Sequence, residues 1–340
     1  MNNRLNKFGQ ELGEFLEYKN ISINDFADRI GTTPKNLIDI LDGRVSLSFN
    51  MICNISFISE IPVNYILNVE KNYKIESYIN NFINNENISI RQFINKFNYK
   101  ELKDKYNIVY KNEQNDYSIA RSILNYLRIT DPNLIYKTDN KIFYKSKNDK
   151  PELLALWLER CYRMILNQEI KEYKKDNIEI LVKFIRDLAK RNIFDEDKLK
   201  KKFNECGIFL AIEEDLKGSK IRGAFRVHNN KPAIYLTKKY KRIADVYFAL
   251  LHELAHCKSD FNRAKSGSIV SLYDDDDKSD YELKADKQAL NWMVPEKDYE
   301  EIVNSKVYKY EIESFLVYRL AQDNHISYNS KLYQEKNVRL

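Results

Sequence analysis

The sequence has little glycine, proline, cysteine or histidine, and each scarcity narrows the class of protein. Its 340 residues include 8 glycines and 6 prolines, which excludes collagenous, Gly/Ser-linker and proline-rich proteins and favours long helices. The 4 cysteines are scattered without a close pair, so we expect no disulfide framework and a cytoplasmic, reducing location. The first residues hold no apolar signal region, and the longest apolar run, 246–251, is too short to cross a bilayer. We therefore expect no signal peptide, no transmembrane helix and no membrane partner.

The chain is long enough for two or three domains, and 43% of its residues are apolar, so a mainly disordered protein is excluded. The net charge of +6 is unevenly placed. Residues 1–70 carry −3, residues 71–204 carry +9, and residues 205–340 are neutral. The basic middle segment could meet nucleic acid or an acidic partner, although solvated helix faces would give the same pattern.

Residues 8–70 are predicted to form a bundle of short helices. Ser22 stands at an N-cap position with Asp25 three residues later, and Gly31 ends the helix that they begin. Thr33 and Pro34 then start another helix, because a hydroxyl cap followed by proline is typical of a helix N-terminus. Two short helices joined by this tight turn form a helix-turn-helix pattern.

The stretch 22–44 resembles XRE-type helix-turn-helix domains, closest to the branch found in HigA-like antitoxins. In that family the second helix of the motif enters the major groove of DNA. The resemblance nominates Thr33, Lys35 and Asn36 for bases and phosphates, and Arg44 for a phosphate. The acidic balance of residues 1–70 opposes DNA binding, so a protein-docking role stays open.

The remainder of the chain changes character near residue 205. Residues 71–204 are predicted to be mostly helical, with a period near 3.6 over 119–127 and 153–166. From 207 a strand, a hairpin over 220–236 with a bulge at Gly223, and a buried helix over 243–257 are expected. The fold class is therefore α+β and predominantly helical. We divide it into a helix-turn-helix domain (1–70), a helical linker or sensor region (71–204), a catalytic core (205–300) and a C-terminal helical extension (301–340).

The run His252-Glu253-Leu254-Ala255-His256 matches the His-Glu-x-x-His pattern. On a helix, residues i and i+4 share one face, so both imidazoles can bind one metal ion. In this motif the glutamate serves as the general base and is not a ligand. A catalytic zinc site needs a third protein ligand and one open position.

Several residues could supply that third ligand. The extended metzincin motif requires Gly at 259 and His at 262, but Ser259 and Asn262 stand there, so that class is excluded. His228 and His325 are conceivable but lack supporting context. The predicted helix over 282–293 offers two acids on one face, Glu282 and Asp286; one can bind the metal while the other orients a ligand imidazole.

The hairpin, the His-Glu-x-x-His helix and the run from Glu282 to Pro295 resemble the ImmA/IrrE metallopeptidase family over about residues 205–300. Such domains often follow an XRE-type helix-turn-helix. Lys287 and Gln288 depart from the family, which more often has an apolar pair there. The resemblance implies a zincin-like, gluzincin fold with Zn²⁺ held by His252, His256 and Glu282, Glu253 as the catalytic base, and Asp286 in support.

The same resemblance implies a task, namely cleavage of a helix-turn-helix repressor that releases mobile-element, phage or stress genes. The alternative is a HigA-like DNA-binding repressor or antitoxin whose C-terminal domain senses or docks without hydrolysis. A toxin or antitoxin partner and a homodimer stay open.

Three further expectations concern parts of this domain. Strand 233–236 is expected at the sheet edge, where it could pair with extended substrate. His228 could stabilise an oxyanion. Residues 258–281, with the acidic run 274–277, are expected to form a long polar loop, either a solvated mobile loop or a lid over the cleft.

Overall fold

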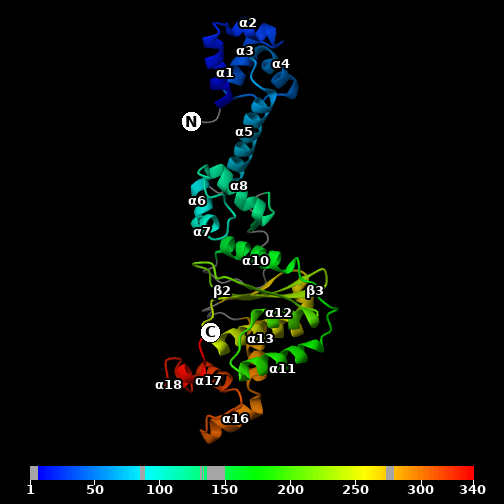
Figure 1. The fold of residues 1–340 in the computed structure, drawn as a ribbon, viewed down its shortest axis with the longest axis vertical. Helices are drawn as coiled ribbons and strands as arrows, with labels where there is room; N and C mark the ends of the chain where they lie inside the picture. Colours follow the sequence, from blue (N-terminus) through cyan, green and yellow to red (C-terminus); the bar gives the residue numbers. More distant parts are fainter. Residues whose placement is uncertain (1–6, 85–88, 131, 133, 136–149, 273–278) are drawn as a thin grey trace. The chain divides into compact units, whose positions relative to one another are not determined.

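The computed structural model describes residues 7–84, 89–130, 132, 134–135, 150–272 and 279–340 (Figure 1). Its chain divides into two compact units, one formed by Met1–Ile94 with Asn112–Ser122 and the other by Asn95–Lys111 with Ile123–Leu340. The division at residues 70, 204 and 300 stays a prediction. Within the described residues, no helix has both the length and the apolar composition needed to cross a bilayer.

The first unit is helical and contains the helix-turn-helix pattern. Ser22 and Thr33 cap their helices as expected, accepting hydrogen bonds from the backbone N–H groups of Asp25 and Asn36 at 3.1 and 3.2 Å. Gly31 has a φ of 71°, which suits glycine at the end of a helix. The helices are α1 (Lys7–Tyr18), α2 (Ile23–Arg29), α3 (Pro34–Leu41), α4 (Phe49–Ser59), α5 (Val63–Asn84), α6 (Ile90–Asn95) and the first part of α8 (Asp116–Leu127).

The second unit combines helices with one small mixed sheet, so the chain is predominantly helical with a minor β component, as predicted. The strands are β1 (Phe209–Glu213), β2 (Ile221–His228), β3 (Lys231–Thr237) and β4 (Ile269–Leu272). The helices are α7 (Tyr99–Asp104), α10 (Pro151–Ile165), α11 (Asn177–Lys190), α12 (Glu196–Glu205), α13 (Ile243–Ser259), α14 (Phe261–Ala264), α15 (Asp280–Met293), α16 (Glu296–Ser305), α17 (Glu313–Gln322) and α18 (Lys331–Lys336).

The sheet order is β1-β3-β2-β4, with β1 parallel to β3 and the other pairs antiparallel. Helix α10 covers one face, and α11 to α13 lie on the other (Figure 1). The β2–β3 hairpin turns through Asn229 and Asn230, whose positive φ values of 49° and 61° suit a tight two-residue turn. The predicted bulge near Gly223 is present as a register shift against β4.

Two expectations about the sheet are wrong. Residues 233–236 lie in β3, which pairs on both sides and therefore has no free edge for substrate. Residues 258–281 are not one long loop, because α14 and the buried strand β4 lie within them. The two edge strands are β1 and β4, and β4 is the one that follows the motif helix closely in sequence. The acidic run 274–277 lies outside the described residues.

Candidate metal centre

Helix α13 carries the His-Glu-x-x-His run in the most buried part of the molecule. Its residues from Ile243 to Cys257 are nearly all apolar and buried, because the helix packs against β2 and β3 on one side and against α11, α15 and α17 on others. His252, Glu253 and His256 are each 0% exposed. Buried polar groups of this kind require partners, and those partners define the site.

Three side chains converge on one point. The Nε2 atoms of His252 and His256 lie 3.1 Å apart, and each lies 3.1 Å from a carboxylate oxygen of Glu282 on α15. Small residues on α15, Ala285 and Ala289, are buried at the same interface and let the two helices approach closely. With metal–ligand bonds of about 2.0–2.1 Å, two ligands of a tetrahedral ion lie about 3.3 Å apart. The group of His252, His256 and Glu282 could therefore hold a metal ion.

The outer imidazole nitrogens are also held by carboxylates. His252 Nδ1 lies 2.8 Å from Asp286 Oδ1, and His256 Nδ1 lies 2.9 Å from Asp260 Oδ2. Asp286 was nominated for such a role from its place on the Glu282 face. This role was not predicted for Asp260 from the sequence, although its position four residues after His256 on the same helix face could have indicated it. With a metal ion bound, donation from both Nδ1–H groups would leave both Nε2 lone pairs free to bind that ion beside Glu282.

Charge within the group depends on these contacts. Burial alone would raise the pKa of Glu282, but hydrogen bonds from His252 and His256 lower it well below the usual range. For His256 burial acts in the opposite direction and would lower the pKa, but Asp260 and Glu282 raise it to about 9. A metal ion needs neutral imidazoles, so its binding here would release a proton.

Glu253 is a buried carboxylate with unused oxygens. Within the described residues neither Oε1 nor Oε2 has a hydrogen-bond partner. Burial raises the pKa of this carboxyl above its usual range, Glu282 adds to the rise, and His252 and His256 oppose it. Such a group beside three side chains that could bind a metal suits an ion with a reacting water, because that water would satisfy the free oxygens.

Gly223 on β2 makes room for this carboxylate. A Cβ atom at position 223 would lie 2.5 Å from Glu253 Oε1 and 3.0 Å from its Cδ. The sequence suggested only a bulge at Gly223. Ser271 on β4 was missed altogether, although its Oγ lies 3.1 Å from His252 Nε2. Neither role was visible, because each depends on the pairing of distant strands.

The two other histidines lie elsewhere. His228 Nε2 lies 2.7 Å from the hydroxyl of Tyr235, and burial together with Arg226 lowers its pKa to about 4. His228 is five residues along β2 from Gly223, or about 16 Å at the rise of a strand. His325 contacts the ring of Tyr299. Neither belongs to the metal group, so both are excluded as the third ligand and His228 also as the oxyanion stabiliser.

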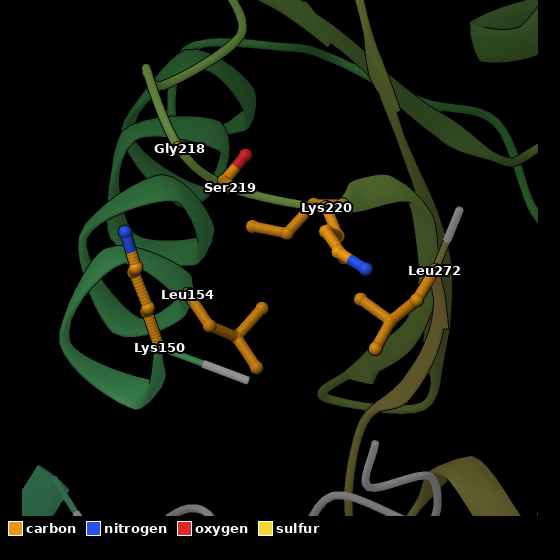
Figure 2. A pocket seen from close by; sticks show the side chains of 7 residues that line it. Lys150, Leu154, Gly218, Ser219, Lys220 and Leu272 are labelled. Atoms are coloured by element: carbon orange, nitrogen blue, oxygen red, sulfur yellow. The ribbon is translucent and has the colours of Figure 1, made fainter. Parts of the chain in front are cut away.

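A pocket on the α10 side of the sheet is separate from this group. Figure 2 shows Lys150 and Leu154 of the α10 region facing Lys220 and Leu272 at the ends of β2 and β4. Its lining contains none of the three metal-binding residues. The pocket therefore does not extend the metal centre.

The nominated DNA contacts occur at the start of α3 and after its end. Thr33 and Lys35 are exposed. The Asn36 amide donates to Thr32 Oγ1 at 2.8 Å, and Arg44 forms ion pairs with Asp39, at 2.8 Å, and with Asp42. Thr33 also caps α3 through its hydroxyl, so three of the four side chains are engaged within the unit.

Comparison of the chain with protein-family models and with curated proteins finds no match to either.

Proposed function

We propose that this chain is a zinc-dependent endopeptidase, of the gluzincin type that the resemblance to ImmA/IrrE proteins implies. Its substrate would be a helix-turn-helix repressor or a similar regulator, and cleavage would release mobile-element, phage or stress genes. One observation carries the proposal: the carboxylate of Glu253 is fully buried, without a described partner, beside the convergent His252, His256 and Glu282.

The donor set favours zinc over magnesium and calcium. Two imidazole nitrogens and one carboxylate are the protein ligands of many catalytic zinc sites, whereas magnesium and calcium prefer oxygen ligands. When bound, Zn²⁺ would polarise the scissile carbonyl and activate water. Asp286 and Asp260, at 2.8 and 2.9 Å from the two Nδ1 atoms, would hold the protons there and thereby orient the ligand rings.

Glu253 would move the proton during hydrolysis. Its carboxylate accepts a proton from water as the water oxygen bonds to the scissile carbon, and it returns that proton to the leaving nitrogen as the C–N bond breaks. A raised pKa suits both transfers, because the group must accept a proton and then release it near neutral pH. Ser271 places a hydroxyl at the same centre.

The sheet suggests how substrate would be held. Strand β4 pairs with β2 on one side and is the last strand of the sheet. An extended peptide could add to its other edge through backbone hydrogen bonds. Ser271, in the middle of β4, would then place the scissile bond next to the metal group.

The test separates chemistry from binding. The full chain is loaded with zinc and incubated with any small helix-turn-helix regulators found to be encoded beside its gene. Wild type should cleave one of them at a defined bond. Glu253→Gln should keep about one zinc per chain and lose cleavage, whereas His252→Ala should lose both. Normal cleavage by Glu253→Gln would refute the assignment of the base.

The DNA-binding repressor is the second candidate, and the exposed Thr33 and Lys35 favour it. The ion pairs that neutralise Arg44 oppose it, because phosphate contacts require free cations. A repressor should bind its own promoter with a steep salt dependence, and Lys35→Ala should weaken that binding while Glu253→Gln leaves it unchanged. Tight promoter binding with no cleavage of any regulator would favour this candidate.

A further inference from the structure

Arg222 is a largely buried cation that contacts Asp286 beside the candidate metal centre. It lies on β2 at the register shift between Ile221 and Gly223. Its side chain is 11% exposed, and its guanidinium carbon lies 4.9 Å from the centre of the Phe248 ring on α13. No motif in the sequence points to this residue.

The contact that matters is with Asp286. Arg222 Nη2 lies 3.3 Å from Asp286 Oδ1, and the same oxygen lies 2.8 Å from His252 Nδ1. One carboxylate oxygen therefore accepts from a cation on β2 and from a ligand imidazole on α13. Arg222, Asp286 and His252 form a continuous chain from the sheet to the metal-binding nitrogen.

The Asp286 carboxylate needs a cation beside it for an electrostatic reason. The Asp286 side chain is only 15% exposed, and a buried carboxylate is costly unless an opposite charge compensates it. Arg222 supplies that charge and stays protonated at any working pH. An ionised Asp286 holds a proton on Nδ1 of His252, so that the Nε2 lone pair can bind a metal ion together with His256 and Glu282.

We propose that Arg222 is a positioning residue of the metal centre: through Asp286 it fixes the tautomer and orientation of the His252 ring. The inference rests on the metal site of the proposed function, but not on the identity of its substrate. Its effect is on metal affinity, which can be measured without any cleavage assay.

The experiment measures Zn²⁺ affinity of the full chain by competition with a chromophoric chelator. Arg222→Met removes the charge and should weaken affinity about 10- to 100-fold, the usual effect of losing a group that supports a ligand. Arg222→Lys restores the charge and should recover most of the loss, which a purely structural role would not do. Asp286→Asn should weaken affinity to a similar degree.

Two comparisons make the result decisive. The double variant Arg222→Met/Asp286→Asn should be no weaker than Asp286→Asn alone, because both changes break one chain of contacts. Arg319→Met is the matched control. Arg319, on α17, is a buried arginine, 6% exposed, that bonds to Val294 and Glu296 and not to the metal group. It should lose stability but keep its zinc affinity.

Each outcome decides something. If Arg222→Met binds zinc as tightly as wild type, or if the losses add fully in the double variant, the role of Arg222 is overturned while the metal site still stands. Equal losses in Arg222→Met and Arg319→Met would also overturn it, by showing a general effect of destabilisation. Wild type that binds zinc no better than His252→Ala would overturn the metal site and with it the proposed function. Should Arg222→Met not fold, Arg222→Gln removes the same charge with a smaller change in polarity and decides by the same comparison with Arg222→Lys.

Discussion

Replacing Gly223 by alanine should separate metal binding from hydrolysis. The φ of Gly223 lies outside the left-handed region, so alanine meets no backbone obstacle there. The obstacle is space. The new Cβ would lie 2.5 Å from Glu253 Oε1, about 0.9 Å closer than ordinary contact, and two further atoms of the same side chain lie at 3.0 Å. The carboxylate must therefore shift by nearly 1 Å.

A displacement of that size in a catalytic group costs about 100-fold in rate, while crowding in a packed interior costs about 1–3 kcal/mol of stability. Gly223→Ala should thus cleave its regulator about 100-fold more slowly than wild type. His252, His256 and Glu282 are untouched, so the variant should still hold about one zinc by elemental analysis.

Gly13→Ala provides the control, because nothing lies within 4 Å of a Cβ at that helical position. It should stabilise the first unit by about 0.5–1 kcal/mol and leave cleavage unchanged. The reasoning fails if Gly223→Ala cleaves at the wild-type rate, or if it loses its zinc as His252→Ala does.

Three further outcomes follow from the structure. Removing metal with a chelator should lower the thermal midpoint of wild type, since zinc at 100 times its Kd contributes about 2.7 kcal/mol; His256→Ala should be insensitive to chelator, and an equal response of both would refute the ligand assignment. Asn337→Ala removes the Oδ1 that accepts from the Ala244 N–H at 2.9 Å and should cost about 1–2 kcal/mol in urea unfolding, whereas the exposed Asn329→Ala should be neutral. Thr33→Ala should cost about 1 kcal/mol of first-unit stability through its lost N-cap, and an unchanged denaturation midpoint would contradict that assignment.

Local rules were enough to predict much of the site. The spacing of His252 and His256 sets both rings on one face of a helix whatever surrounds it. Glu282 and Asp286 follow the same rule on α15, and the structure places Glu282 beside both Nε2 atoms and Asp286 beside His252 Nδ1. The caps at Ser22 and Thr33 and the turn at Asn229 depend only on neighbours in the chain.

The failures concern contacts between distant segments. Strand order depends on which strands pair, and β3 lies between β1 and β2 although nothing within it signals a central position. Strand β4 has four residues and lies in a polar stretch, so its short apolar run gave too little signal. Gly223, Ser271 and Arg222 reach the site only through that pairing, which is why sequence alone did not select them.

The C-terminal residues complete the motif helix at its other end. Val338 accepts a hydrogen bond from the Ile243 N–H, Asn337 accepts from the Ala244 N–H, and the Leu340 N–H donates to Lys241. These partners are synthesised some ninety residues after the helix that they cap. Until those residues have been made, the first-turn N–H groups of α13 lack these partners within the protein. The helix that carries His252 and His256 therefore depends for its N-terminal cap on a segment 93 positions later in the chain, so folding of the candidate metal centre requires a contact far from it in sequence.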